Sequence, residues 1–366
     1  MVPCKKRIEK GCDGMIRQNS YKILTYTISM LLVCIFRCAV AEENGVRIDE
    51  EHFPDDIFRE AVMEYDLDKD GILSAEEAEK VTVINVDEQH VVSLQGVEYL
   101  TGLKELSCYI NRLTELDVSR NIKLETLNCA RNKLTVLDLS HNPELRILNC
   151  DFNRRLTELN VSGNAKLEEL YCDMNKLTAL NLSHNPELKI LYCGNNELTE
   201  LNISGNQKLK VLKCESNELK DLDVNLNTSI EDLNCGNNKI TDLNLSSLSG
   251  LKCLDVSRCG VNYLDLNVCP NLEELVCEGC GLTELNLSNN PQLKVLLCAD
   301  NQLTVIDISN CTKLVEMVED SEPVQANAGF GNALIWVNKQ ELADNLNKII
   351  LITDKDVVPY ITMTDH

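Results

Sequence analysis

The chain has 366 residues, of which 58 are acidic and 35 basic, and its formal net charge is −23. An acidic surface of this kind repels phosphate backbones and anionic lipid headgroups, so nucleic-acid binding and a basic membrane-surface protein are disfavoured. Hydrophobic residues make up 44% of the chain but aromatic residues only 4%. The core is therefore expected to be aliphatic, with few of the aromatic walls that usually line small-molecule pockets.

The N-terminal segment has the order of a secretory signal peptide. Basic residues are frequent in residues 1–22, an apolar run follows at 23–36, and small residues lead up to Ala41. This order predicts a signal peptide over residues 1–41 that is cleaved after Ala41, followed by a linker at 42–52.

An uncleaved membrane anchor is the alternative interpretation of this segment. Arg37 ends the apolar run at about 14 residues, which is short of the ~20 residues that a membrane span needs. We therefore expect a secreted or extracellular cell-surface protein with no membrane insertion after signal cleavage.

The twelve residues DLDKDGILSAEE, at positions 66–77, fit the calcium loop of an EF-hand. Three aspartates supply carboxylates, an isoleucine offers its backbone carbonyl, and a glutamate can close the coordination sphere with both oxygens. The predicted ligands of this Ca²⁺ site are Asp66, Asp68, Asp70, Ile72 and Glu77.

The residues around this loop predict an EF-hand-like helix–loop–helix cap over residues 53–80. Apolar residues follow a helical stripe in residues 54–65, and a short helix is expected at 75–81. Ser74 and Glu77 also fit a capping box for that second helix, a role that is compatible with calcium binding. Because no second loop exists, we expect a structural Ca²⁺ ion that rigidifies the N-terminal end, not a paired calcium sensor.

A 21-residue repeat organises the chain from residue 103 onward. Ten full copies are in phase, as in LKELSCYINRLTELDVSRNIK from 103 and LETLNCARNKLTVLDLSHNPE from 124, and the copy from 145 carries one extra arginine. Degenerate copies at both ends extend the repeat region to residues 81–318. Self-similarity at a fixed period of this length is the signature of a leucine-rich-repeat solenoid.

The apolar positions within each copy predict the shape of the coil. Counting the first leucine as position 1, positions 1, 4, 6, 11, 14 and 16 are Leu, Ile, Val or Cys and point inward. The segments LxxLxC and LxxLDL alternate as strands do, and no stretch is long enough for a helix. The predicted fold class is a repeat solenoid, mostly β, of stacked parallel strands with few helices and a small α-helical N-terminal cap.

Cysteine and asparagine recur in fixed columns of the repeat. Asparagines at positions 9 and 19 are expected to satisfy backbone groups at tight corners. Cysteines at position 6 are expected to be buried free thiols, because side chains stacked in a parallel ladder are poorly oriented for disulfides. The position 6 cysteines are Cys108, Cys129, Cys150, Cys172, Cys193, Cys214, Cys235, Cys277 and Cys298.

The nested pattern LxxLxCxxN followed by LxxLDLSxN resembles the 21-residue leucine-rich repeats of bacterial surface and secreted proteins, broadly internalin-like. The resemblance covers about two thirds of the chain, and cysteine at position 6 matches that subgroup. It implies a right-handed solenoid without long helices that is used for binding. It does not imply a ligand, because leucine-rich repeats bind many unrelated partners.

The sequence predicts a protein that is not an enzyme. It contains no Gly-rich phosphate loop, nucleophile elbow or HExxH motif. Residues 319–366 contain no cysteine, which argues against the bacterial leucine-rich-repeat ubiquitin ligases with a catalytic cysteine in a C-terminal domain. This segment is expected to be a C-terminal cap or the start of a truncated domain.

The outward positions 3, 5, 7 and 8 vary between copies, whereas positions 12, 15 and 17 are monotonous. We therefore predict a monomeric protein-binding or adhesion module whose variable strand face binds a protein or glycan ligand. A passive structural or coat protein of the cell surface is the alternative, as is a non-catalytic part of a larger secreted effector or enzyme. The predicted partner site consists of Ile147, Phe152, Tyr171, Met174, Ile190, Tyr192 and Lys213.

Overall fold

The computed structural model describes most of the chain, namely residues 45–298, 300–303, 310–311, 313, 350–352 and 357–359. The predicted signal peptide at 1–41 lies outside the described residues. Of the C-terminal segment at 319–366, the structure describes only two strands, β14 (Ile350–Ile352) and β15 (Val357–Pro359), which pair antiparallel. None of the described helices is long and apolar enough to cross a membrane.

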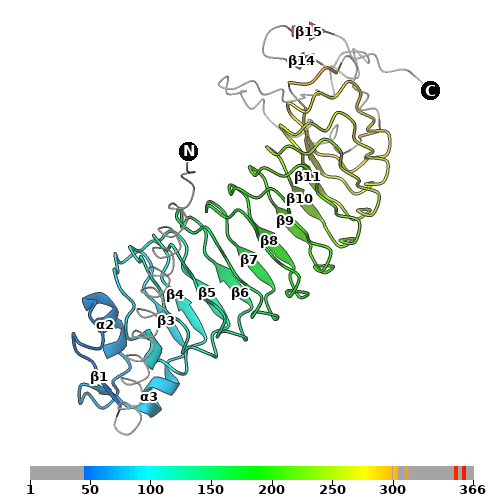
Figure 1. The fold of residues 1–366 in the computed structure, drawn as a ribbon. Coiled ribbons are helices and arrows are strands. Elements are labelled where there is room, and N and C mark those ends of the chain that lie inside the picture. The colour runs from blue at the N-terminus through cyan, green and yellow to red at the C-terminus, as the bar shows by residue number, and fades with distance from the viewer. Residues whose placement is uncertain are drawn as a thin grey trace, which may run out of the picture.

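The repeat region forms an elongated coil with one parallel sheet along its length (Figure 1). Its eleven strands form ten parallel pairs between successive turns, so the order in the sheet follows the order in the chain. This arrangement confirms the predicted solenoid of stacked parallel strands. The strands are β3 (Val83–Asn85), β4 (Glu105–Ser107), β5 (Thr126–Asn128), β6 (Ile147–Asn149), β7 (Glu169–Tyr171), β8 (Ile190–Tyr192), β9 (Val211–Lys213), β10 (Asp232–Asn234), β11 (Cys253–Asp255), β12 (Glu274–Val276) and β13 (Val295–Leu297).

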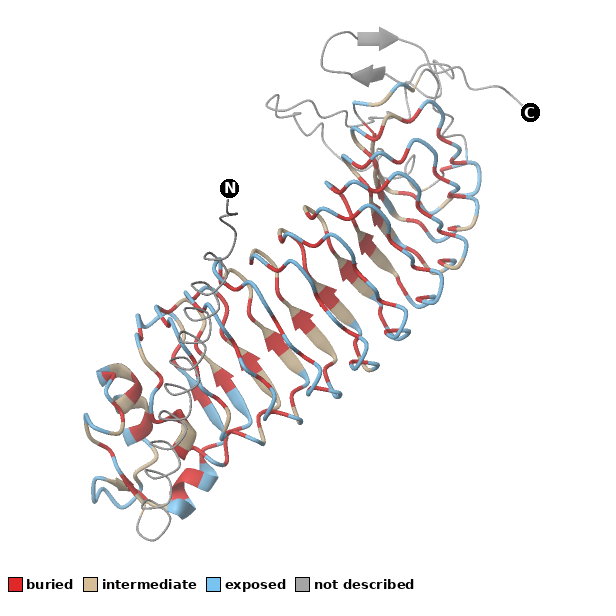
Figure 2. Cartoon of the chain, viewed as in Figure 1, coloured by how far each residue is buried: buried red, intermediate tan, exposed pale blue. Residues whose placement is uncertain are grey.

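The inward positions of the repeat form one continuous aliphatic core. In each strand the central residue, such as Leu127 or Leu148, is fully buried and its two neighbours are more exposed. Figure 2 shows buried and exposed residues alternating along each turn. A single turn cannot bury its apolar side chains alone, so the stability of each turn depends on its neighbours.

The second half of the repeat is not a strand, contrary to the prediction from LxxLDL. Pairing there is limited to isolated bridges, such as the one between Asp138 and Asn160. The reason is a local hydrogen bond, because the side chain at position 15 accepts the N–H of position 17. Asp117 accepts from Ser119 at 2.9 Å in this way. Such Asx turns bend the chain and end strand pairing.

The asparagines at position 9 join successive turns, as predicted. The amide nitrogen of Asn132 donates to the carbonyls of Cys108 at 2.8 Å and Cys129 at 3.1 Å, and its oxygen accepts the N–H of Leu113 at 3.0 Å. One buried side chain therefore satisfies backbone groups in two turns. The described members of this column are Asn111, Asn132, Asn153, Asn175, Asn196, Asn217, Asn238 and Asn301.

The position 19 asparagines do the same at the opposite corner. The amide nitrogen of Asn142 donates to the carbonyls of Val118 at 2.9 Å and Asn121 at 3.0 Å, both in the preceding turn. Asn142 is completely buried. Both asparagine columns therefore belong to the scaffold.

The cysteines at position 6 form a buried ladder. All of the described cysteines are free thiols, and the position 6 members are at most 1% exposed. Burial raises the pKa of the Cys129 thiol to about 12 and that of Cys172 well above its usual value. A thiol with so high a pKa is neutral at physiological pH and packs as a small apolar side chain.

A small cap closes the N-terminal end of the coil (Figure 1). It contains α2 (Asp56–Met63), α3 (Ala75–Lys80) and a short antiparallel pair of β1 (Val46–Arg47) and β2 (Ile72–Leu73). A 3₁₀ helix, η1 (Val97–Tyr99), precedes the first full repeat. Both α-helices lie within the ranges that the sequence predicts.

The cap is fixed to the solenoid by packing and by hydrogen bonds. Phe53 packs against Phe58 and Tyr99, with ring centroids 5.9 and 5.8 Å apart. One carboxylate oxygen of Asp55 caps α2, and the other accepts the N–H of Val92 at 2.8 Å. The cap and the first turn therefore share one core.

Candidate functional site

The variable face of the solenoid ends at a column of residues with left-handed backbone. The φ angles at position 8 are 51° for Ile110, 54° for Arg131, 57° for Phe152 and 54° for Met174. A left-handed residue other than glycine costs about 1–2 kcal/mol, so this column is held by its surroundings. The N–H of Phe152, for example, donates to the carbonyl of Asp173 in the next turn at 2.9 Å. The position 8 side chains consequently line the edge of the sheet.

The structure brings the predicted partner residues together in three adjacent columns of the face. Tyr171, Tyr192 and Lys213 occupy paired positions of β7, β8 and β9. Ile147 and Ile190 lie in the parallel column at position 3, separated by Glu169. Phe152 and Met174 follow at the edge. All seven residues are half-buried, so the patch is less exposed than the sequence suggested.

Two tyrosines form the centre of this face. The rings of Tyr171 and Tyr192 meet edge to face with their centroids 5.1 Å apart. The Tyr171 hydroxyl donates to Glu169 Oε2 at 2.9 Å. Burial, together with this hydrogen bond, raises the pKa of Tyr171. The two rings therefore hold each other in position, and the Tyr171 hydroxyl remains neutral at physiological pH.

Half-buried carboxylates at position 7 hold neighbouring turns of the face together. Asp151 accepts the N–H of Asp173 at 2.6 Å, and Asp173 accepts the N–H of Gly194 at 2.5 Å. Burial raises the pKa of Asp151 to about 6. Burial and the nearby charges of Asp151 and Glu215 raise the pKa of Asp173 to about 7. These groups titrate near neutral pH.

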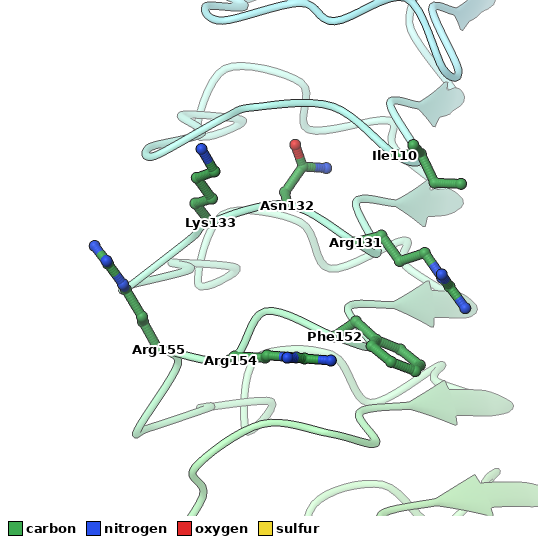
Figure 3. Close-up of a pocket in the computed structure, with 7 residues that line it drawn as sticks. All are labelled: Ile110, Arg131, Asn132, Lys133, Phe152, Arg154 and Arg155. Atoms are coloured by element: carbon green, nitrogen blue, oxygen red, sulfur yellow. The ribbon is translucent and has the colours of Figure 1, made fainter.

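A pocket of about 490 Å³ opens at the edge of the face (Figure 3). The Arg131 guanidinium lies 4.4 Å from the centroid of the Phe152 ring, and that of Arg154 lies 5.8 Å from it. The sequence predicted Phe152 as part of a partner surface but missed the cations around it. They come from separate turns, at positions 8 and 10, so no local motif reveals them. The lining residues are Ile110, Arg131, Asn132, Lys133, Phe152, Arg154 and Arg155.

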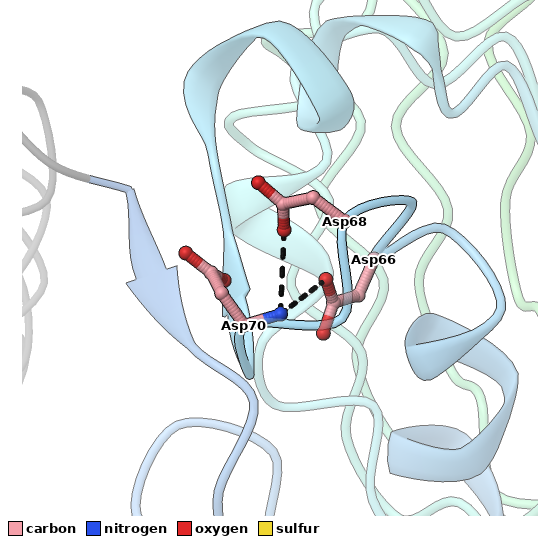
Figure 4. Close-up of side chains that lie close together, drawn as sticks. All are labelled: Asp66, Asp68 and Asp70. Carbon is pink, nitrogen blue, oxygen red and sulfur yellow. Dashed lines mark hydrogen bonds between the residues drawn. The ribbon is translucent and has the colours of Figure 1, made fainter.

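Three of the five predicted calcium ligands come together in the loop before β2 (Figure 4). Carboxylate oxygens of Asp66, Asp68 and Asp70 all lie within 4.8 Å of one another. The N–H of Asp70 donates to Asp66 and Asp68, and the N–H of Gly71 donates to Asp66 at 2.9 Å. The backbone hydrogen bond from Asp70 lowers the pKa of Asp68, but the loss of hydration in the loop and the charges of Asp70 and Glu77 outweigh it, so the pKa is raised. A cation would relieve this repulsion.

Glu77 lies outside this group of carboxylates. One of its oxygens accepts the N–H of Leu67 at 2.8 Å, and the other accepts the Ser74 N–H at 2.9 Å and hydroxyl at 2.7 Å. The predicted capping box is therefore present, and the hydrogen bonds from Ser74 lower the pKa of Glu77. Ile72 lies in β2, paired with Arg47. The donor set suits a hard cation, with three carboxylates assembled and Glu77 engaged in the loop's own hydrogen bonds.

The repeat region is similar to proteins of known structure. The chain matches no family model. A segment of 70 residues is 33% identical to Internalin J of Listeria monocytogenes serotype 4b (strain F2365), covering 19% of this chain and 8% of that protein. An internalin, InlF, of the strain 4b F2365 has a TM-score of 0.67 at 24% identity, with 74% of this chain and 82% of that chain covered. The similarity to InlF shows that the two chains share a fold.

The functional domain of InlJ from Listeria monocytogenes, described as including a cysteine ladder, is 30% identical in sequence. The similarity covers 75% of this chain and 71% of that domain, with a TM-score of 0.58. The buried column from Cys108 to Cys298 is such a ladder in this chain. The chain belongs to the internalin-like family of bacterial leucine-rich-repeat proteins.

Proposed function

We propose that this chain is a non-enzymatic, secreted or cell-surface module that binds a protein through the strand face of its solenoid. The observation that carries the proposal is the aligned column of Tyr171, Tyr192 and Lys213 on three hydrogen-bonded strands. Tyrosine rings supply a large contact area at low entropic cost, and they are enriched at the centres of protein interfaces. Membership of the internalin-like family supports the binding role and the surface or secreted location.

The rigidity of the face favours binding. The strands β7, β8 and β9 are each paired on both sides, and Asp151 and Asp173 hydrogen-bond to the backbone of the next turn. A surface that is already ordered loses little conformational entropy when a partner docks. The T-shaped pair of Tyr171 and Tyr192 is likewise preorganised.

A passive coat protein is the alternative function. Such a protein needs only a uniform stacking surface, and positions 15 and 17 supply one through their repeated Asx turns. The strand face differs from turn to turn, with tyrosines at position 5 of β7 and β8, lysine in β9 and asparagine in β10. This variation on one face favours recognition of a particular partner.

We further propose that the cap holds a structural Ca²⁺ ion. Asp66, Asp68 and Asp70 would supply its first carboxylate ligands, with the Ile72 carbonyl and Glu77 completing the set as the sequence predicts. The ion would neutralise clustered negative charge and stiffen the loop between α2 and α3.

A pull-down tests the binding role. Immobilised residues 42–366 are compared with the variant Tyr171→Ser/Tyr192→Ser, and Tyr263→Ser serves as a matched control because Tyr263 is 60% exposed and lies away from the strand columns. The expected result is a partner that is retained by the wild type and the control but lost from the double variant. Retention at wild-type strength by the double variant places the site elsewhere. Absence of any partner favours the coat alternative.

A further inference from the structure

The edge pocket carries an unusual charge for this protein. Four of its seven lining residues are cationic, namely Arg131, Lys133, Arg154 and Arg155, in a chain with a net charge of −23. All four are exposed, and Phe152 and Ile110 between them are half-buried. Figure 3 shows their side chains around one opening at the ends of the strands.

Many cations elsewhere on the solenoid are neutralised by acidic partners. Lys104 pairs with Glu125 at 2.8 Å, and Lys252 pairs with Glu231 at 2.6 Å, each between adjacent turns. Within the described part of the chain, none of the four pocket cations forms an ion pair. Arg131 lowers the pKa of Asp151 through its charge but is not bonded to it. The pocket therefore presents four cations that no ion pair engages.

The one irregular copy of the repeat contributes to this pocket. The copy from residue 145 reads NRRL at 153–156, where the other full copies have a single residue between position 9 and the next inward apolar residue. The insertion places both Arg154 and Arg155 in the pocket lining, with the Arg154 side chain directed toward Phe152 and that of Arg155 pointing the other way (Figure 3). Position 9 is unaffected, since Asn153 keeps its bonds to Cys129 at 3.1 Å and Leu134 at 3.0 Å. The extra arginine thus adds charge without disturbing the scaffold.

We infer that this pocket binds a short acidic segment, rich in Asp or Glu, of a protein partner. The inference rests on the proposed protein-binding role and specifies its ligand chemistry. Guanidinium groups bind carboxylates through two parallel hydrogen bonds, and the Phe152 ring orients Arg131 for such contacts. Phe152 and Ile110 add apolar surface that suits the stems of peptide side chains.

The limited length of the positive zone favours a short acidic segment over a long polyanion. At position 10 the run of cations from Arg112 to Lys176 is interrupted, because the next two turns carry Glu197 and Glu218. The next cation in this column, Lys239, is paired with Glu218. Glu88 lies at position 8 of the turn before Ile110. An extended glycosaminoglycan or nucleic acid crossing several turns would meet these carboxylates and be repelled.

Direct titration of the purified chain tests the inference. The probe is a fluorescein-labelled hexaglutamate peptide followed by fluorescence anisotropy, and the same label on a Gly–Ser hexapeptide is the blank. Binding to the wild type is expected to saturate and to weaken as salt increases. Arg131→Glu/Arg154→Glu is expected to weaken it at least tenfold. The variant Arg131→Lys/Arg154→Lys keeps the positive charge but loses the planar guanidinium groups. Its affinity for the peptide should lie between those of the wild type and Arg131→Glu/Arg154→Glu.

The matched control is Arg120→Glu/Lys220→Glu, which changes the net charge equally at exposed positions outside the pocket. It should bind the peptide within about twofold of the wild type, and all variants should keep the wild-type melting temperature. Three results would overturn the inference: no saturable binding at millimolar peptide, equal loss in the control, or tighter binding of a heparin tetrasaccharide in the same titration. The titration needs no partner from the pull-down, so the two tests can fail separately. If the peptide binds but the pull-down finds no partner, the proposed function is rejected and the preference of the pocket for carboxylates still holds.

Discussion

The Cys259 thiol donates a hydrogen bond to the backbone carbonyl of Cys235 at 3.2 Å, in the place that asparagine takes in earlier turns. One turn before, Asn238 donates to the carbonyl of Cys214 at 3.0 Å, and its oxygen accepts the N–H of Leu219 at 3.0 Å. A thiol is a weaker donor than an amide and a poor acceptor. Cysteine at position 9 therefore reproduces only part of the asparagine's bonding.

Replacing Cys259 tests this account of the column. Cys259→Asn adds an amide that can also accept the N–H of Ile240, so it should raise the free energy of unfolding by about 1 kcal/mol. Cys259→Ala removes one of the two donors to the Cys235 carbonyl, which keeps the amide of Asn238 at 2.9 Å, and should lower the free energy of unfolding by about 0.5 kcal/mol. Urea unfolding followed by circular dichroism measures both. Equal midpoints for Cys259→Ala and the wild type would contradict a bonding role for the thiol.

The thiols should differ in their accessibility to alkylating reagents. Cys253, the first residue of β11 and position 3 of its repeat, is half-exposed, whereas the ladder cysteines such as Cys150 are fully buried. Burial raises the pKa of both thiols, and that of Cys150 lies well above its usual value. We expect native labelling of residues 42–366 with iodoacetamide to modify Cys253 before the ladder cysteines, which should react only after denaturation, as mass spectrometry can count. The variant Cys253→Ser should lose this early labelling. Immediate labelling of the ladder cysteines in the native protein would contradict their burial.

The repeat pattern predicts the core and the two asparagine columns because each depends on which side chains face inward. It could not predict the left-handed backbone at position 8. Glycine and asparagine favour that conformation, but Ile110 and Phe152 occupy it here because bonds to the next turn impose it. The edge pocket was missed for the same reason, since that turn brings together arginines from different copies.

The calcium loop shows a second limit of sequence reasoning. Spacing alone predicts that Asp66, Asp68 and Asp70 lie together, because they alternate within one tight turn. Spacing could not show which of two compatible bonding patterns Glu77 adopts. In the structure the capping bonds to Ser74 and the bond from Leu67 hold it.

The cap should depend strongly on Asp55. This buried carboxylate accepts the N–H groups of Ile57 and Phe58, both at 3.1 Å, and that of Val92 at 2.8 Å. Asp55→Ala removes a helix cap and the tie to the first turn, so it should destabilise the cap by about 2–3 kcal/mol. Hydrogen exchange of α2 amides measures the effect. Asp56→Ala, at the exposed neighbouring position, is the control, and equal protection in the two variants would contradict the prediction.

Calcium should stabilise the chain through the aspartate loop. Titration with Ca²⁺ after chelation should raise the melting temperature, because the ion binds the folded loop and not the unfolded chain. The triple variant Asp66→Asn/Asp68→Asn/Asp70→Asn should abolish the rise. The control variant Glu50→Gln/Glu60→Gln/Glu64→Gln removes the same charge at exposed positions and should keep the rise in melting temperature. An unchanged melting temperature with no heat in calorimetry would show that the loop holds no calcium.

The position 7 carboxylates should make stability depend on pH. The folded-state pKa of Asp173 is about 7, above the ordinary value of 3.8, because of burial and the charges of Asp151 and Glu215. The folded state therefore binds more protons than the unfolded state between about pH 4 and 7. The contribution of Asp173 to stability consequently falls as pH rises through this range and is constant above it.

In the wild type, Asp173 accepts the N–H of Gly194 at 2.5 Å. The variant Asp173→Asn keeps an oxygen that can accept this hydrogen bond but removes the titrating carboxylate. Because the carboxylate is partly exposed, solvent screening reduces the effect, and we expect the variant to gain about 1–2 kcal/mol over the wild type at pH 8. The gain should disappear near pH 4, where the wild-type carboxyl is already protonated when folded. Urea unfolding at both pH values measures the difference, with Asp242→Asn at an exposed position as control. A gain that is equal at pH 4 and pH 8, or one that the control shares, would mean that the charge on Asp173 is not its source.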